Sequence, residues 1–152
     1  MVTLTQQAET VASKRYYLKD ESGEPEENAN TLLKRVAKAI ASSEKLYGKT
    51  DADTQLTEKE FYDMMSSLNF IPNSPTLMNA GTEQGTLSAC FVLPLEDSME
   101  DIMKAAHDIA MVQKFGGGTG FALSKLRPKG DKIKTTHGIA CGPIQVLQTL
   151  SR

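Results

Sequence analysis

Residues 87–94 read LSACFVLP, a run of apolar and small side chains that stops at a proline. Successive side chains of a strand point to opposite faces of its sheet, so we expect Ser88, Cys90 and Val92 to share one face. The pattern predicts a strand over residues 86–93 with an apolar face and a face that carries a thiol. Such a strand is compatible with a barrel wall whose inner face forms a site.

A helical pattern follows this strand. Asp97 and Ser98 can cap it, and its apolar stripe is expected to contain Met99, Ile102, Met103, Ala106, Ile109 and Ala110. The pattern ends at the run GGGTG of residues 116–120, after which residues 121–126 predict a second strand. A last helical pattern covers residues 144–150. Strand, helix, strand and helix in this order predict an α/β construction.

The first part of the chain is helical in pattern. Residues 30–47 repeat apolar side chains at helical spacing, and Gly48 stands where a helix C-terminus favours glycine. A second helix is expected to begin at Thr57, with Glu60 completing a capping box. The two prolines of residues 70–76 argue against a helix there.

Composition excludes several classes of protein. The chain has 152 residues, 39% hydrophobic and 24% charged, which fits one folded domain rather than a disordered chain. The formal charge of −2 gives no overall basic field for nucleic acid. No long apolar run or signal peptide is present, so we expect a cytoplasmic protein without membrane attachment. Cys90 and Cys141 match neither a CxxC motif nor a zinc spacing, so no metal site is predicted and each is by default a small buried hydrophobe.

Three features leave alternatives open when the residues are considered alone. The glycine run of residues 116–120 is neither a P-loop nor a dinucleotide fingerprint; it is either a helix stop or a place where a ligand approaches the backbone closely. Ser74 lies in a Ser-Pro turn and is by default a local loop hydroxyl. Arg127 opens a basic stretch that is either a solvated edge or a phosphate contact.

Taken together, the motifs resemble the start of the catalytic barrel of ribonucleotide reductase large chains, and they are most similar to the class II, adenosylcobalamin-dependent form. The segment RYYLKD at residues 15–20 is similar to the N-terminal helical domain of that family. The barrel motifs are FIPNSPTLMNAG at 70–81, LSACFVLP at 87–94, GGGTG at 116–120, LRPKG at 126–130 and THG at 136–138.

The resemblance implies an α/β fold in which an N-terminal helical domain precedes the first strands and helices of a ten-stranded α/β barrel, here incomplete. We accordingly expect a disordered tail at residues 1–14, the helical domain at 15–70 and the start of the barrel at 71–152. The activity implied is the reduction of ribonucleotides, with diphosphates favoured, to 2′-deoxyribonucleotides for DNA synthesis. The reaction is radical chemistry with a redox cysteine pair.

The resemblance also assigns residues. It makes Cys90 the catalytic cysteine of the first barrel strand. The positions that hold the substrate are Ser74, Ala89, Cys90 and Gly118. Those near the allosteric effector site are Asp97, Ser98 and Arg127, with Asp97 expected at the ribose and Arg127 at a phosphate. Cys141 stands where the family more often has a small residue such as serine, and we do not expect it to be the redox partner.

The implied cofactor is adenosylcobalamin, with its binding residues outside this sequence. The implied partners are a ribonucleotide substrate, a nucleoside triphosphate effector, a thioredoxin-like reductant and the remainder of the reductase chain or a complementary fragment. The complete enzyme is expected to be a homodimer without membrane or nucleic-acid partners. The chain is expected to be an N-terminal fragment that is inactive alone. The alternatives are a non-catalytic remnant or assembly module that docks on reductase subunits, and a class I large chain that uses a separate radical subunit.

Overall fold

The structure is a computed structural model that describes residues 2–83, 86–134 and 136–151. It divides into two compact units, Met1–Ala89 and Cys90–Arg152. The division lies after Ala89, not at the boundary expected between residues 70 and 71. The reason is that the segment before Cys90 is bonded into the first unit. The Asn79 side-chain amide donates to the Thr86 carbonyl at 2.7 Å, and the Thr76 hydroxyl donates to the Leu87 carbonyl at 3.0 Å.

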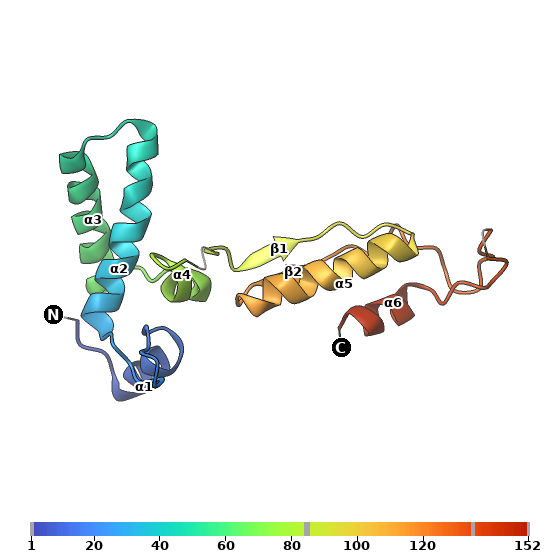
Figure 1. Ribbon diagram of the computed structural model, residues 1–152, viewed down its shortest axis with the longest axis horizontal. Coiled ribbons are helices and arrows are strands. Elements are labelled where there is room, and N and C mark those ends of the chain that lie inside the picture. The colour runs from blue at the N-terminus through green and yellow to red at the C-terminus, as the bar shows by residue number, and fades with distance from the viewer. Residues whose placement is uncertain (1, 84–85, 135, 152) are drawn as a thin grey trace. The chain divides into compact units, whose positions relative to one another are not determined.

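The first unit is helical, and its two long helices α2 and α3 lie side by side (Figure 1). Its elements are α1 (Gln6–Arg15), α2 (Ala29–Ala41), the 3-10 helix η1 (Ser42–Tyr47), α3 (Asp51–Ser66) and α4 (Ser74–Asn79). The predicted end of the first helical pattern at Gly48 is confirmed, because Gly48 has a φ of 78° and caps η1. The buried core contains Ala12, Tyr17, Leu32, Leu33, Val36, Ala37, Met65, Leu77 and Ala80.

Helix α1 replaces the disordered tail that the sequence predicted for residues 1–14. The Thr5 side chain caps this helix by accepting from the Ala8 amide at 3.2 Å. The Val2 amide donates to the Asn30 side chain at 3.0 Å, and Ala12 is only 6% exposed in the core. The polar sequence is ordered because tertiary contacts with α2 hold it.

Helix α3 begins at Asp51, six residues before the expected Thr57. Thr50 and Asp53 form the capping box, with the Asp53 amide donating to Thr50 Oγ1 at 3.2 Å and the Thr50 amide donating to Asp53 Oδ2 at 3.1 Å. The capping box at the start of α3 is therefore formed by Thr50 and Asp53, and not by Thr57 and Glu60 as predicted.

Helix α4 lies where two prolines were expected to prevent a helix. Pro75 occupies the first turn of α4, and Asn73 caps the helix by accepting from the Thr76 amide at 2.9 Å. Proline is tolerated in a first turn because its missing N–H has no intrahelical partner there. The result is a short helix that begins at Ser74.

The second unit has the predicted alternation of strand and helix (Figure 1). Strand β1 (Cys90–Val92) pairs in parallel with β2 (Gly118–Gly120), and α5 (Met99–Lys114) forms the connection that parallel strands require. Helix α6 (Pro143–Leu150) follows. The core of this unit consists of Leu95, Ala105, Ile109, Leu126, Val146 and Leu150.

Two strand predictions need correction. Strand β1 covers three residues instead of 86–93, because the residues before Cys90 bond to α4. Strand β2 lies on the glycine run itself and not on residues 121–126. Gly118 and Gly120 pair with Cys90 and Val92 of β1. The residues that follow leave the strand, and Phe121 and Leu123 pack against the core of the second unit. The glycine run is thus part of the sheet.

The Ser98 cap of α5 is confirmed, because its hydroxyl accepts from the Asp101 amide at 3.0 Å. The expected apolar stripe is only partly correct. Met99 and Met103 are 69% and 56% exposed, whereas Ala105 and Ile109 are buried. No helix among the described residues is long and apolar enough to cross a membrane.

Candidate functional site

The parallel strands bring two predicted site residues together. Cys90 and Gly118 are direct partners in the register of β1 and β2. Both are exposed, and the Cys90 sulfur is a free thiol. Since paired residues of neighbouring strands face the same side, the thiol stands on an open face beside a position without a side chain. That arrangement leaves the backbone of β2 exposed beside the thiol.

The opposite face of the strand pair is packed. Phe91 is half-buried there, and a Cβ atom built on Gly117 would lie 2.9 Å from the Phe91 ring and 2.7 Å from Val112 Cγ1. A larger residue at Gly117 would therefore push β2 away from β1 or from α5. The glycine run has a structural role at Gly117 and leaves Gly118 on the open face.

The other two expected substrate residues belong to the first unit. Ala89 is half-buried at its end, directly before Cys90. Ser74 is the first residue of α4, and its Oγ lies 3.0 Å from the phenolic oxygen of Tyr16. The structure thus pairs Cys90 with Gly118 and places Ser74 in a separate network.

The three expected effector residues gather at the start of α5. Arg127 Nε donates to Asp97 Oδ2 at 2.6 Å, and Arg127 Nη2 donates to the Asp97 carbonyl at 3.3 Å. Both side chains remain about one-third exposed, at 34% and 32%. A second ion pair, Lys125 with Glu96, joins the same two segments. Ser98 follows Asp97, but its hydroxyl is engaged in the cap and donates to Asp101 Oδ2 at 2.6 Å.

Asp97, Ser98 and Arg127 line a cavity of about 570 Å³. Its walls also include Leu126, Ile133, Val146 and Cys141. A smaller hollow of about 410 Å³ shares Asp97 and Arg127 and adds Asp131, Lys132, Ile133 and Lys134. Lys132 and Lys134 belong to the basic stretch identified from the sequence, although only Arg127 was predicted to contact a phosphate. Glu100 also lines the larger cavity, so the two hollows together present the cations Arg127, Lys132 and Lys134 beside the carboxylates Asp97, Glu100 and Asp131. Such a mixed lining can bind an anionic group through the cations and hydroxyl groups through the carboxylates.

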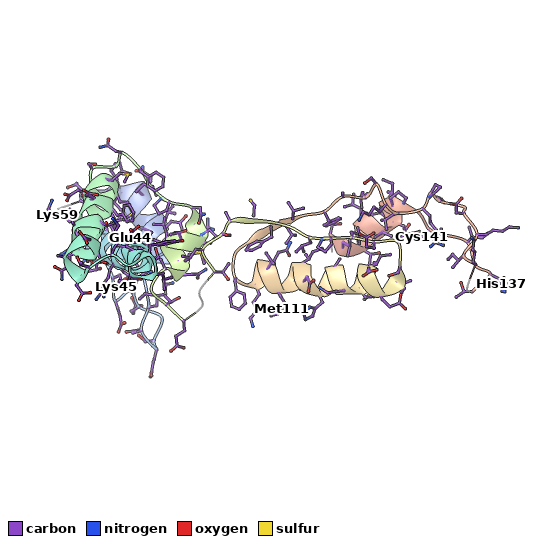
Figure 2. All side chains as sticks on the ribbon, turned by 90° about the horizontal axis from the view of Figure 1, so that it is seen from above. Glu44, Lys45, Lys59, Met111, His137 and Cys141 are labelled. Atoms are coloured by element: carbon purple, nitrogen blue, oxygen red, sulfur yellow. The ribbon has the colours of Figure 1, made fainter. Side chains whose placement is uncertain are left out.

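Cys141 lines this cavity together with Val146 of α6. It is exposed rather than buried, and Figure 2 shows it near the base of the segment whose far end carries His137. The next residue, Gly142, has a φ of +84°, and a Cβ atom there would lie 2.8 Å from the Lys129 backbone nitrogen. The bridge between Lys132 and Ile139 folds the segment back on itself. The Cys141 side chain therefore forms part of the wall of the 570 Å³ cavity.

Sequence analysis missed the network behind Ser74. Tyr16 contacts Ser74, and the largely buried ion pair of Arg35 with Glu27 holds the surrounding backbone. No local pattern indicates such contacts, because the partners lie far apart in the chain. Among the described residues, no group of three or more His, Cys, Asp or Glu side chains is arranged to hold a metal ion.

Comparison with known families divides the chain at nearly the same place as the structure. Residues 2–85 match the model described as ribonucleotide reductase, all-alpha domain. Residues 88–152 match the model described as ribonucleotide reductase, barrel domain. The two matches meet close to the division after Ala89.

Individual relatives agree with the family models. A vitamin B12-dependent ribonucleoside-diphosphate reductase of Mycobacterium tuberculosis is 43% identical over 93% of this chain and 20% of its own length. A protein with the same description from Thermoplasma acidophilum is 37% identical over 95% of this chain and 26% of its own length. The ribonucleoside-diphosphate reductase subunit alpha of Bacillus subtilis is 38% identical over 60% of this chain and 13% of its own length. The chain thus spans about a quarter or less of the length of these relatives.

Proposed function

The chain belongs to the ribonucleotide reductase large-chain family, and we propose that it forms part of an enzyme that reduces ribonucleoside diphosphates to 2′-deoxyribonucleotides. The relatives that cover more than nine-tenths of the chain include reductases that act on ribonucleoside diphosphates. The observation that carries the proposal is the register of β1 and β2. It places a free thiol at Cys90 directly beside Gly118 on an exposed face.

The reaction assigns a defined role to the Cys90 thiol. Cys90 and a second cysteine each lose one electron and one proton, and their sulfur atoms join in a disulfide. The C2′–O bond of the ribose breaks, a C–H bond replaces it and the oxygen leaves as water. A serine hydroxyl could not close the disulfide, so the chemistry requires a thiol at this position. We assign the second cysteine to a part of the barrel outside this sequence.

Substrate contacts are proposed for Ser74, Ala89 and Gly118. The absence of a side chain at Gly118 lets a nucleotide approach the backbone of β2 beside the Cys90 thiol. Ser74 offers a hydroxyl that is half-buried and has its partner Tyr16 on one side. These residues would hold the ribose and the phosphates in place while the thiol acts.

We propose the cavity at the start of α5 as the site of a nucleoside triphosphate effector. Arg127, Lys132 and Lys134 supply positive charge for the phosphates, and Asp97 can accept from ribose hydroxyls. Because the Ser98 hydroxyl is used by the cap, its contribution is to fix the start of α5 beside Asp97.

Adenosylcobalamin is the proposed cofactor of the complete enzyme, where it would generate the radical. Four cavities among the described residues, including the two at the start of α5, have no histidine in their walls, and no group of three or more His, Cys, Asp or Glu side chains in the same residues is arranged to hold a metal ion. The described residues therefore do not form a site that fits the cofactor, and no step is assigned to it here. A thioredoxin-like reductant is the proposed partner that reopens the disulfide.

The test replaces Cys90 by serine in a full-length reductase chain that contains this sequence. We expect the loss of repeated deoxynucleotide formation with a dithiol reductant, while binding of the ribonucleoside diphosphate persists. Cys141→Ser is the matched control and should retain turnover, because Cys141 lies in the wall of the other cavity. Near-normal repeated turnover by Cys90→Ser would contradict the proposal.

A second test addresses the glycine run. Gly118→Val should raise KM for the substrate at least tenfold, equivalent to about 1.4 kcal/mol of binding free energy. Thr119→Val is the control, since Thr119 lies on the opposite face of the same strand and valine has nearly its shape. Equal KM values for the two variants would contradict the substrate contact of Gly118 and leave the glycine run with a structural role only.

A further inference from the structure

The Ser74 hydroxyl has a single side-chain hydrogen-bond partner within the described residues. The phenolic oxygen of Tyr16 lies 3.0 Å from Ser74 Oγ, although 58 positions separate the two residues. Tyr16 follows the last residue of α1 and Ser74 is the first residue of α4. Both side chains are half-buried, and the Tyr16 ring packs against the core of the first unit. The phenol is thus held in place by the core.

The backbone on both sides of this contact is held by Arg35. Its guanidinium donates to the carbonyls of Tyr16 at 3.3 Å, Leu77 at 3.1 Å and Ala80 at 2.6 Å. Two further bonds, at 2.8 and 2.9 Å, bind the guanidinium to the Glu27 carboxylate. The Arg35 and Glu27 side chains are only 12% and 9% exposed. One buried group therefore fixes both the residue that carries the phenol and the helix that carries Ser74.

Either hydroxyl of the Tyr16–Ser74 hydrogen bond could be the donor. Only one of the two directions leaves the Ser74 proton free to bind a substrate. A serine hydroxyl has one proton to donate and two lone pairs that accept. If Ser74 donated to Tyr16, it would have no proton left for a phosphate oxygen. A phenol that donates to Ser74 Oγ instead leaves the serine proton available, and hydrogen bonds in such a chain strengthen one another.

We propose that Tyr16 is a positioning residue that donates its phenolic hydrogen bond to Ser74 and thereby directs the serine hydroxyl toward an anionic oxygen of the substrate. This inference rests on the proposed contact of Ser74 with the substrate. It adds a residue outside the barrel motifs to the substrate site. It also gives the Arg35–Glu27 pair a role in holding Tyr16 and α4 at the distance that the hydrogen bond requires.

The experiment measures the equilibrium Kd of a ribonucleoside diphosphate for a full-length reductase chain that contains this sequence, together with KM and kcat. The variants are Tyr16→Phe, Ser74→Ala and the double variant. Tyr16→Phe keeps the packed ring and removes only the hydroxyl. The control is Tyr17→Phe, which removes the neighbouring phenol that bonds to Glu9 and not to Ser74. Thermal unfolding of each variant confirms that it is folded.

We expect Tyr16→Phe to raise Kd and KM about 3- to 10-fold, the range for one lost hydrogen bond, with kcat unchanged. Ser74→Ala should weaken binding at least as much, and Tyr16→Phe should add nothing to it, because the phenol acts only through the serine. Tyr17→Phe should leave Kd unchanged.

Three results overturn the reasoning at different points. An unchanged Kd for Ser74→Ala removes the proposed substrate contact of Ser74 and this inference with it. A weaker Kd for Ser74→Ala with a normal Kd for Tyr16→Phe refutes the positioning role alone. If Tyr16→Phe weakens binding equally in the Ser74→Ala background, the phenol supports the fold and does not direct the serine.

Discussion

Replacing Arg35 by methionine should destabilise the first unit more than any surface substitution in α2. The change keeps an unbranched side chain of similar length and removes the guanidinium. That group is bonded to the Glu27 carboxylate and to three backbone carbonyls, and its side chain is 12% exposed. The variant leaves Glu27, 9% exposed, with a buried charge and no cation beside it.

The expected loss of unfolding free energy comes from the Glu27 carboxylate, which the variant leaves without a cation. Removing one partner of a buried ion pair costs about 3–5 kcal/mol. The Leu18 amide still donates to Glu27 at 2.9 Å, so we expect the lower half of that range. Since a whole domain is stable by about 5–15 kcal/mol, this loss is a large fraction of the stability of the first unit.

The assay is denaturant unfolding of the chain by circular dichroism, combined with hydrogen exchange of α2 and α4. Amides of α5 serve as the internal reference, because they belong to the second unit. Lys38→Met is the control, since it removes an exposed cation from the same helix and should change stability by no more than about 0.5 kcal/mol. Adding Glu27→Gln to Arg35→Met should recover part of the loss, because the buried charge disappears. A loss below about 1 kcal/mol for Arg35→Met, within the range of one ordinary hydrogen bond, would refute the stabilising role of the Arg35–Glu27 pair in the first unit.

Three other predictions follow from local features. Gly142→Ala should lower the stability of the second unit by at least about 1–2 kcal/mol in thermal unfolding, because Gly142 has a φ of +84° and the Lys129 nitrogen would lie 2.8 Å from the added Cβ. Gly130→Ala is the control: Gly130 has a φ of +96° but open space around it, so this variant measures the backbone strain without the steric clash. Burial and then the hydrogen bond from Tyr17 to Glu9 raise the Tyr17 pKa above its ordinary 10.0. This contribution to stability is therefore complete below pH 10.0 and disappears as the pH rises from there through the folded pKa. Phenolate absorbance should show an ionisation step above pH 10.0 that Tyr17→Phe removes. The second unit exposes large apolar side chains such as Val92, 90% exposed, on a two-stranded sheet, so the 152-residue chain should self-associate in sedimentation; a monodisperse monomer with protected amides over residues 90–126 would contradict this expectation.

The predictions that succeeded from sequence concern bonds between near neighbours in the chain. Ser98 caps α5 through Asp101, three residues away, and Gly48 ends η1 through its own left-handed conformation. The alternation of strand and helix after Cys90 was also predictable from the spacing of apolar side chains. Such signals need no knowledge of the rest of the fold, because the interacting groups lie within one turn of one another.

The predictions that failed depend on partners far along the chain. Residues 1–14 were predicted to be a disordered tail because their sequence is polar, but the contact of Val2 with Asn30 and the burial of Ala12 order residues 2–14. Strand β1 was expected to begin at residue 86, yet Thr86 and Leu87 bond to α4 through their carbonyls. Competition between distant partners, rather than local propensity, set these boundaries.

The candidate site shows the same division. The sequence by itself determined the family, the presence of a thiol at Cys90 and the absence of a side chain at Gly118, because motif order and residue type carry that information. Only the tertiary structure decided that Cys90 and Gly118 are register partners and that Tyr16 contacts Ser74. The physical reason is that strand register and long-range hydrogen bonds arise when separate segments pack together, and neither is encoded in the residues on either side of each contact.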